Sequence, residues 1–525
     1  MSVPDILIPK PLERAVDVTV ETNILEPVSH QYDVRTGGVT RFVLPAKGVL
    51  DAPNCTINFE LVNGDALTAG TDQNTIYPIW AGGLGCFKKI TCRVGGQILS
   101  QINEAGMYAT MKTGFNSVDY KANVLDVRHS SSNQSLTKVL NDNPNGDPGF
   151  VNAVTARGYS QMSNPTLDQQ NIYGCQAEGV QANVLHVPQT NKLIRDFANR
   201  GRGPEVAIRL ADLFPYFESN MLPLLGMAQV ELEIHWNSSV TDATTLANIT
   251  NNIVAPANPV AAGGSDAYSA TFAKPPVLSM DYLHYPDQER QQIMDSIANG
   301  LTMNFREVVF TQGINAAGTG TVTSNHLLGM AGKEVQNIYV VKRPDLNTTP
   351  DQQINSQIYN RNNLTCQFKS QQSKDESYNC FINNQKIYNR DVNNASLQYN
   401  YLTQCENKWH CAPLEYDCMN YDADLNMVLN NSSPLGVPNL AVDTNGISGR
   451  FLPGSKHVLG IPLMKYSSLG NAPGNGERIG SAPIEFVYSN TKTGGENDMS
   501  TNLLFFIEYR RSMVITPLGV TVSDQ

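Results

Sequence analysis

The sequence VLSMDYLHYPDQER, residues 277–290, joins an expected strand to an expected helix. Its first part, Val277 to Leu283, is a short apolar run typical of a β-strand. Pro286 follows, and acidic residues come directly after it, which is how helices begin. We expect this helix to continue to about Asn299 and to mark the boundary between two domains.

On the N-terminal side of this boundary, short apolar segments alternate with polar residues and end at Gly or Asn. Alternation with a period of two is the pattern of half-buried antiparallel strands. The strands expected from this pattern are residues 41–45, 56–62, 86–94, 205–210 and 229–236. One short helix is expected at 102–118. Residues 119–204 are predicted to form a long loop excursion, and 238–269 a linker-like stretch.

The second half repeats this plan in different residues. Its expected strands are 305–311, 321–328, 335–343, 379–388, 457–464, 483–488 and 503–516. Loops rich in Asn and Gln lie between them, above all at 344–378 and 419–450.

The two halves together predict an all-β fold of two consecutive eight-stranded antiparallel jelly rolls, with short helices in loops and at the junction. The expected divisions are an extended N-terminal arm at 1–30, a first jelly roll at 31–285, a helical junction at 286–300 and a second jelly roll at 301–525. The arm contains apolar residues, which suggests that it docks on something.

The charge of the chain limits its function. Its formal net charge is −11, and only 16% of its residues are charged. Since phosphate binding needs a basic face, direct nucleic-acid binding is not expected. No apolar run is long enough for a transmembrane helix, and the N-terminus lacks the pattern of a secretory signal. Nine irregularly spaced cysteines suggest free thiols in a reducing compartment.

Motifs for catalysis or metal binding are weak. Cys405, His410, Cys411 and Cys418 form the densest potential metal cluster, but their spacing is not that of a zinc site. Two acidic groups are more simply explained as solvated loops than as a carboxylate pair or Ca²⁺ site: Asp142 with Asp147, and Asp417 with Asp422 and Asp424. Gly82–Gly85 precedes a strand and is expected to be a loop, not a phosphate site. We expect no catalytic, cofactor-binding or metal-binding residues, and no cofactor.

Aromatic and cysteine residues have structural explanations. Residues 77–80 and 214–217 combine aromatics with proline and could stack on sugar rings, but filling the open end of a barrel core is favoured. Cys86 and Cys92 are expected to share a strand face as buried small side chains.

Four segments, in the same order along the chain, resemble the double jelly-roll major capsid proteins of icosahedral double-stranded DNA viruses. These are residues 206–225, the junction at 277–310, the strand end at 383–388 and the closing strand at 503–515. At the junction, Asp287, Glu289 and Arg290 fill the matching positions. Asn384 stands where the family often has glycine, and a virophage-like or polinton-like member fits better than the giant-virus branch.

The resemblance implies a structural protein with no enzyme activity. Three copies would form a pseudo-hexagonal capsomer, and capsomers would tile an icosahedral shell in the virion, assembled inside the host cell. Penton and minor capsid proteins are its implied partners. Two alternatives stay open: a double jelly-roll hydrolase acting on glycans, with converging acidic residues at the barrel interface, and a sugar-binding spike module using Trp80 or Trp409.

Overall fold

The fold is seen in a computed structural model, which describes part of the chain. The described residues are 18–33, 36–63, 76–78, 82–113, 115–116, 202–218, 221–237, 240–241, 254–256, 268–316, 318–344, 376–406, 458–464, 476–492, 501–517 and 519–524.

The first half forms three antiparallel sheets. The seven-stranded sheet contains β1 (Thr19–Leu25), β4 (Val49–Leu50), β5 (Thr56–Asn63), β9 (Arg202–Arg209), β11 (Val240–Thr241), β13 (Tyr268–Phe272) and β14 (Val277–His284). The five-stranded sheet contains β2 (Ser29–Asp33), β3 (Gly37–Leu44), β7 (Phe87–Val94), β8 (Gln97–Asn103) and β10 (Val230–Trp236). A two-stranded sheet pairs β6 (Ile76–Pro78) with β12 (Val254–Pro256).

Short helices connect these strands. They are η2 (Ala52–Asn54), η4 (Gly82–Cys86), α1 (Ala105–Thr113), α9 (Leu210–Leu213), η7 (Pro215–Phe217) and η8 (Leu224–Gly226).

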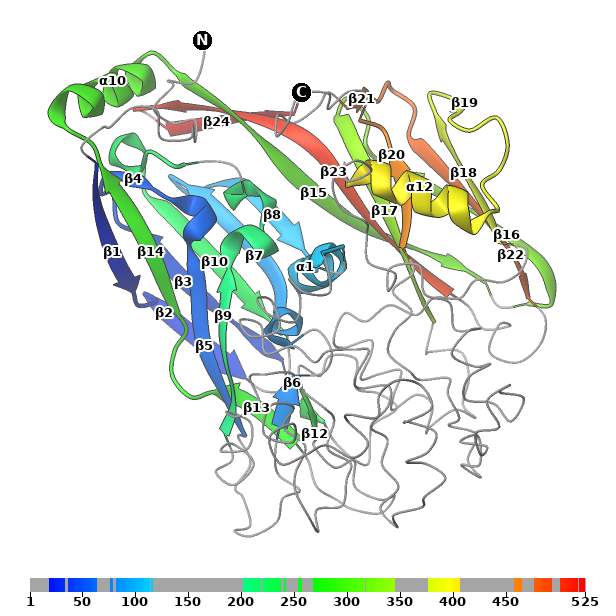
Figure 1. Ribbon diagram of the computed structural model, residues 1–525, viewed down its shortest axis with the longest axis horizontal. Helices are drawn as coiled ribbons and strands as arrows, with labels where there is room; N and C mark the ends of the chain where they lie inside the picture. Colours follow the sequence, from blue (N-terminus) through cyan, green and yellow to red (C-terminus); the bar gives the residue numbers. More distant parts are fainter. Residues whose placement is uncertain are drawn as a thin grey trace, which may run out of the picture.

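The second half forms two antiparallel sheets. The six-stranded sheet contains β15 (Leu301–Asn315), β17 (Glu334–Pro344), β20 (Val458–Pro462), β21 (Glu477–Arg478), β23 (Thr501–Thr516) and β24 (Gly519–Asp524). The four-stranded sheet contains β16 (Gly320–Leu328), β18 (Ser377–Ile382), β19 (Gln385–Lys386) and β22 (Ile484–Lys492). The helix α12 (Ala395–Cys405) packs beside β20. Figure 1 shows the two β assemblies side by side, with α1 between them.

The junction helix is present where the sequence predicts it. α10 (Asp287–Ala298) begins directly after Pro286 and carries Asp287 and Glu289 in its first turn. Its buried side chains are Ile293 and Ile297. In the described residues, no strand before this helix pairs with a strand after it.

Several predicted boundaries differ from the structure. The arm predicted at 1–30 includes a paired strand, because β1 runs antiparallel to β14 along its whole length. The linker-like stretch 238–269 contains β11, β12 and the start of β13. The helix predicted at 102–118 is shorter, and the strand β8 precedes it, reached through a turn in which Gly95 and Gly96 take positive φ.

The strand predicted at 379–388 is a hairpin. β18 and β19 are joined through Asn383 and Asn384, whose φ angles are +51° and +62°. Asparagine tolerates this left-handed conformation better than most residues, so Asn384 can occupy a position where glycine is common. The long loops predicted at 119–204, 344–378 and 419–450 lie almost entirely outside the described residues.

Candidate functional site: the interface between the barrels

The strand β23 is buried on both of its faces. Leu503, Phe505 and Ile507 point into the core of the second barrel. The residues between them, Leu504 and Phe506, belong instead to a core that continues into the first barrel. Because successive strand residues point to opposite faces, Glu508 also lies on the side of the first barrel.

Helix α1 brings the first barrel up to this face. Tyr108 and Lys112 are four residues apart, so they lie on the same side of the helix. Gly106 permits the close approach of α1 to η4, since a Cβ at that position would lie 2.0 Å from the Leu84 carbonyl oxygen. The Tyr108 ring lies 5.8 Å from that of Phe506, and Phe115 stacks on Tyr339 at 5.9 Å.

A buried ionic cluster connects the two barrels around Glu508. Its Oε1 accepts a 2.5 Å hydrogen bond from the Tyr108 hydroxyl, and its Oε2 accepts one of 2.9 Å from Asn337. Lys112 Nζ lies 3.4 Å from Oε1, and an Arg306 nitrogen lies 3.7 Å from Oε2. The Glu508 side chain is fully buried, so these groups replace the water that it loses.

Glu406 extends the cluster at the end of α12. Its Oε1 lies 2.5 Å from Lys112 Nζ and accepts a 2.5 Å hydrogen bond from the Tyr339 hydroxyl. Lys112 Nζ also lies 4.9 Å from the centre of the Tyr339 ring, within cation–π range. One lysine of the first barrel therefore contacts two carboxylates and an aromatic ring of the second.

These charges determine the protonation of the cluster. Burial alone would raise the pKa of Glu508, but Lys112 and Arg306 outweigh it and hold the pKa at about 2. Burial lowers the pKa of Lys112, yet Glu406 and Glu508 raise it further, so the net shift is upward. Glu508 and Lys112 are thus both ionised at neutral pH.

A second polar link lies at β8. Glu307 of β15 accepts a 3.2 Å hydrogen bond from the Gln101 backbone N–H and pairs with Arg511 at 3.1 Å. Arg511 also donates to the Leu99 carbonyl at 3.1 Å and pairs with Asp524 at 2.7 Å. This link therefore fixes the strand β8 of the first barrel against β15 and β23.

The free energy of unfolding should depend on pH in two ranges, one governed by Glu307 and the other by Glu508. Burial raises the pKa of Glu307 to about 7, although Arg511 and Gln101 act to lower it. Glu307 therefore binds more protons folded than unfolded, and its contribution should increase as pH falls from about 7 towards its ordinary range. Glu508 behaves oppositely: its contribution should be lost as pH falls from its ordinary range through about 2.

We expect Glu307→Gln to abolish the pH dependence that comes from Glu307 and to leave the pH dependence that comes from Glu508. The amide keeps the shape of the side chain but does not titrate. Urea unfolding of the wild type and the variant between pH 5 and pH 8 measures the effect. The free energy of unfolding should increase less in the variant than in the wild type as the pH is lowered. An unchanged pH profile would show that Glu307 does not titrate in this range.

The aromatic segment 214–217 is buried, and the sugar-stacking interpretation of this segment is wrong. Phe214, Tyr216 and Phe217 are at most 1% exposed. Tyr216 packs edge-to-face on Phe305 at 5.0 Å, and its hydroxyl lies 3.5 Å from the Met513 sulfur. The segment fills the space between the barrels and not the end of one of them.

Other predicted site residues have structural roles or lie outside the described residues. Cys405 is buried at the end of α12, whereas His410, Cys411 and Cys418 are not described. The acidic groups at 142–147 and 417–424, together with Trp80 and Trp409, are also outside the described residues. Gly82–Gly85 lies in the 3-10 helix η4 before β7.

Cys86 and Cys92 are both buried, as expected, but Cys86 ends η4 and is not on the strand. Among the described residues, no group of three or more His, Cys, Asp or Glu is arranged to hold a metal ion. No helix in the described ranges has the length and apolarity required to span a membrane.

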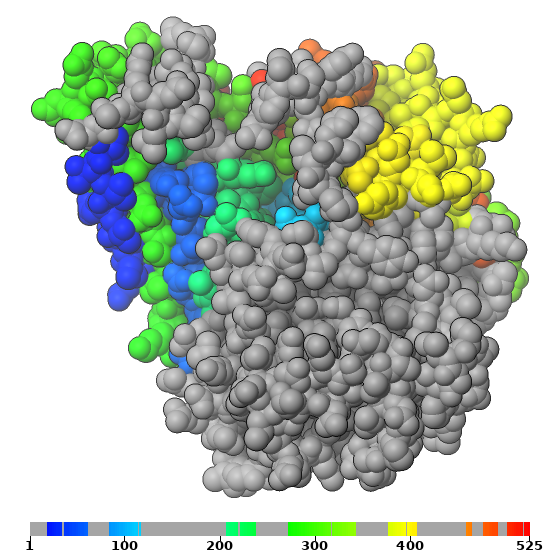
Figure 2. Space-filling view, in the orientation of Figure 1, coloured from blue at the N-terminus to red at the C-terminus, as the bar shows by residue number. Residues whose placement is uncertain are grey.

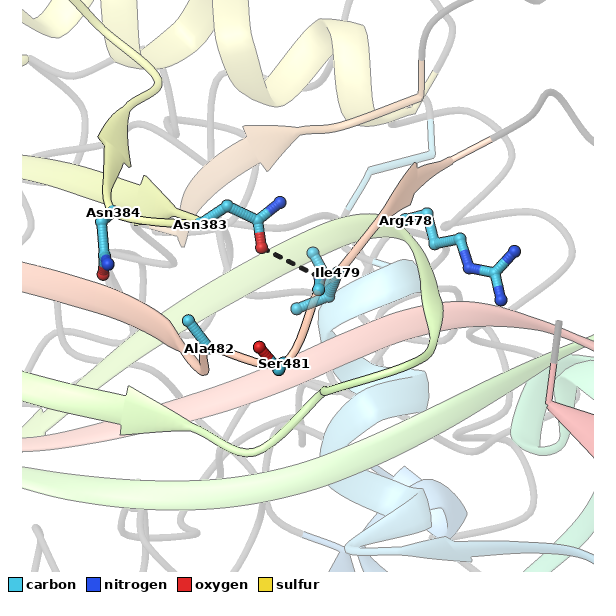
Figure 3. A pocket seen from close by; sticks show the side chains of 7 residues that line it. Asn383, Asn384, Arg478, Ile479, Ser481 and Ala482 are labelled. Atoms are coloured by element: carbon cyan, nitrogen blue, oxygen red, sulfur yellow. Dashed lines mark hydrogen bonds between the residues drawn. The ribbon is translucent and has the colours of Figure 1, made fainter.

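An open pocket of about 440 Å³ lies at the β18–β19 hairpin. It is lined by Asn383, Asn384, Arg478, Ile479, Gly480, Ser481 and Ala482 (Figure 3). The Asn383 Oδ1 accepts a 2.9 Å hydrogen bond from the Gly480 backbone N–H, which holds the hairpin against the neighbouring segment. The described residues that line it include neither an aromatic ring for a sugar nor an acidic residue for hydrolysis.

Two exposed apolar side chains lie on the edge strand β1, and a single one lies on the edge strand β16. Val20 and Ile24 of β1 are 57% and 68% exposed, and Leu327 of β16 is 69% exposed. β1 ends the seven-stranded sheet and β16 ends the four-stranded sheet. Figure 2 shows β1, in blue, on the outside of the molecule, so this edge is accessible for association.

The interface residues Lys112 and Glu508 were not predicted as functional. For Glu508 a signal exists: it is the single acid within the apolar run LLFFIEY, residues 503–509. A charge inside a strand that is apolar on both faces requires a buried partner.

Comparisons with known proteins show the fold. No protein-family model matches the sequence, and no curated protein matches it. Many solved structures match the chain, and three of them, which match almost the whole chain at low identity, illustrate the similarity. A chain of the Sputnik virophage has a TM-score of 0.55 at 11% identity, covering 98% of this chain and 90% of that one.

The other two structures are chains of viral capsids. The Faustovirus major capsid protein gives a TM-score of 0.52 at 10% identity, covering 97% of this chain and 92% of its own. A chain of the PBCV-1 virus capsid gives 0.50 at 11% identity, covering 98% of both chains. The chain therefore has the double jelly-roll fold that the sequence predicts.

Proposed function

We propose that this chain is a major capsid protein that forms trimeric, pseudo-hexagonal capsomers of an icosahedral virus shell. The observation that carries the proposal is the interface between the barrels, which joins two jelly rolls into one block by buried charges and aromatic rings. The similarity in fold to capsid chains over nearly the full length supports it.

The interface suits this function for a geometric reason. A trimer of double barrels presents six similar barrels, which approximates sixfold symmetry only if both barrels of each chain keep a fixed relation. The link through Glu508 and the link through Glu307 tie different elements of the two barrels, so rotation of one barrel would break at least one of them.

We propose the domain division on the same basis. The first barrel would begin at Thr19, since β1 belongs to its sheet, and would end near residue 285. Residues 286–300 would form the junction, and 301–525 the second barrel. Residues 1–17 of the predicted arm lie outside the described residues.

The proposed partners are other copies of this chain, first in the trimer and then between capsomers. The edge strand β1, with exposed Val20 and Ile24, is a suitable contact surface. Penton and minor capsid proteins would join the same shell, and the acidic net charge argues against direct binding of nucleic acid.

An enzyme function is disfavoured by the burial of the interface carboxylates. Acidic residues do converge there, as a glycan hydrolase would require. However, Glu508 is fully buried, is held by four donor groups and has a pKa of about 2, so it cannot deliver a proton near neutral pH. Its arrangement is that of a structural ion cluster. Glu307 has a pKa of about 7, but it is only 4% exposed and pairs with Arg511, so it is not open to a substrate.

Assembly can be tested on the purified full-length chain. We expect light scattering at micromolar concentration to give the mass of three chains, and negative-stain microscopy to show a hexagonal outline. A stable monomer at that concentration would contradict the proposal. Glycan hydrolysis that disappears on substitution of one acidic residue would support the enzyme alternative instead.

A further inference from the structure

Three polar residues meet at one end of the second barrel's core. On β17, Ile338 and Val340 point into this core, and Lys342 continues their row at a spacing of two. On β22, Phe486 and Tyr488 do the same, and Asn490 follows them.

Glu376 is the third member of this group. It precedes β18, whose residues Tyr378 and Cys380 also face the core. Ser377 is paired with Ser489, so Glu376 continues the register opposite Asn490. Directly opposite residues of antiparallel strands have Cβ atoms about 5 Å apart. The three side chains thus share one layer inside the barrel.

The three residues are buried, and two of them are in contact. Lys342, Glu376 and Asn490 are 1%, 1% and 3% exposed. Lys342 Nζ contacts Glu376 Oε1, and the Tyr488 hydroxyl donates a 2.8 Å hydrogen bond to the same oxygen. Asn490 lies two residues after Tyr488 on β22 and therefore on the same face of the strand.

Two atoms in this layer remain unsatisfied. Within the described part of the chain, Glu376 Oε2 and Asn490 Oδ1 are buried and have no hydrogen-bond partner. A buried oxygen without a hydrogen-bond partner is destabilising, because it has lost its water without gaining a donor. A pair of full charges in this layer is also unfavourable, because burial penalises both the ammonium and the carboxylate. Transfer of a proton from Lys342 to Glu376 would remove both charges and leave a nucleophilic amine in the same layer as the Asn490 amide.

We propose that Lys342 and Asn490 form an intramolecular isopeptide bond, with Glu376 as the acid–base group. The Lys342 nitrogen attacks Cγ of Asn490, the new Cγ–Nζ bond forms, and the Cγ–Nδ2 bond breaks. Protonated Glu376 donates to Oδ1 as negative charge develops there.

The proton and atom balance needs no further reagent. The amine gives one proton to Glu376 before attack and one to the departing nitrogen afterwards. The Tyr488 hydroxyl donates to Glu376 and would hold its carboxyl group in place during these transfers. Ammonia leaves, and the carboxyl group keeps the proton that it took from the lysine.

The bond would clamp the second barrel. Lys342 lies in the six-stranded sheet and Asn490 in the four-stranded sheet, so the new amide crosses from one sheet to the other. Like a disulfide, such a cross-link restricts the unfolded chain, but it does not depend on an oxidising compartment. The cysteines in the described residues are free and buried, so an isopeptide bond would supply a cross-link that these thiols do not.

Mass spectrometry of the full-length wild-type chain tests the proposal, whatever its assembly state. We expect an intact mass lower than the sequence mass by about 17 Da, the mass of the ammonia released in forming the covalent link. Proteolysis should yield one branched peptide that joins the segments containing Lys342 and Asn490. A wild-type chain at full sequence mass would overturn the proposal.

Variants separate this reaction from other losses of ammonia. Cyclisation at an Asn-Gly sequence releases ammonia too, but it does not require a lysine. We expect Lys342→Arg, Asn490→Ala and Glu376→Gln to have their full sequence masses, and the surface control Lys386→Arg to keep the deficit. A deficit that persists in Lys342→Arg would contradict the proposal. If these variants do not fold, the presence or absence of the branched peptide in the wild-type chain still shows whether Lys342 and Asn490 are covalently linked.

Discussion

Replacing Glu508 by alanine is expected to lower the free energy of unfolding by about 3–5 kcal/mol, the cost of leaving buried charges without their partner. Lys112 and Arg306 would lose the carboxylate that faces both of them at 3.4 and 3.7 Å. Tyr108 and Asn337 would lose an acceptor. Because these donors come from both barrels, the loss should also weaken the connection between the barrels.

Urea unfolding at pH 7 measures this effect, and two further variants make it specific. Lys47→Ala removes an ion pair with Glu21 in which both side chains are more than 40% exposed, and it should leave the unfolding midpoint almost unchanged. Glu508→Gln keeps the shape and should abolish the loss of stability at acid pH that the pKa of about 2 predicts. A Glu508→Ala protein as stable as the wild type would show that the cluster does not hold the barrels.

Alternation and turn residues were sufficient to predict most of the strands. The prediction at 229–236 corresponds to β10, and that at 503–516 to β23, because both segments have strong apolar patterns. The position of α10 could be predicted because Pro286 and the acidic residues after it are a local signal for the start of a helix. The strand β8 was missed because its sequence, QILSQIN, has only weak alternation.

The interface could not be predicted in the same way, because its contacts join distant parts of the chain. Lys112 and Glu508 are separated by 396 residues. Nothing near Lys112 distinguishes it from a solvated lysine at the end of a helix. The burial of residues 214–217 was correctly favoured, but their partners, Phe305 and Met513, follow only from the docking of the two barrels.

The same docking predicts a large effect at Tyr216. We expect Tyr216→Ala to destabilise the protein by about 3–5 kcal/mol, as for other deletions of a buried aromatic ring. Tyr216 is fully buried and contacts Phe214 and Phe217 of its own segment as well as Phe305 across the interface. The cavity would lie between the barrels, where the surrounding strands cannot close it without moving one barrel relative to the other.

Tyr216→Phe is the matched control. It keeps the ring and removes only the hydroxyl, whose partner at 3.5 Å is the weakly accepting Met513 sulfur. We expect this variant to unfold close to the wild type, whereas Tyr216→Ala should unfold at lower urea and give fewer hexagonal capsomers by negative-stain microscopy. Equal stability of the two variants would mean that the ring contributes no packing between the barrels. Loss of capsomers in the alanine variant alone would instead connect barrel docking directly to assembly, because Tyr216 is too deeply buried to contact another copy.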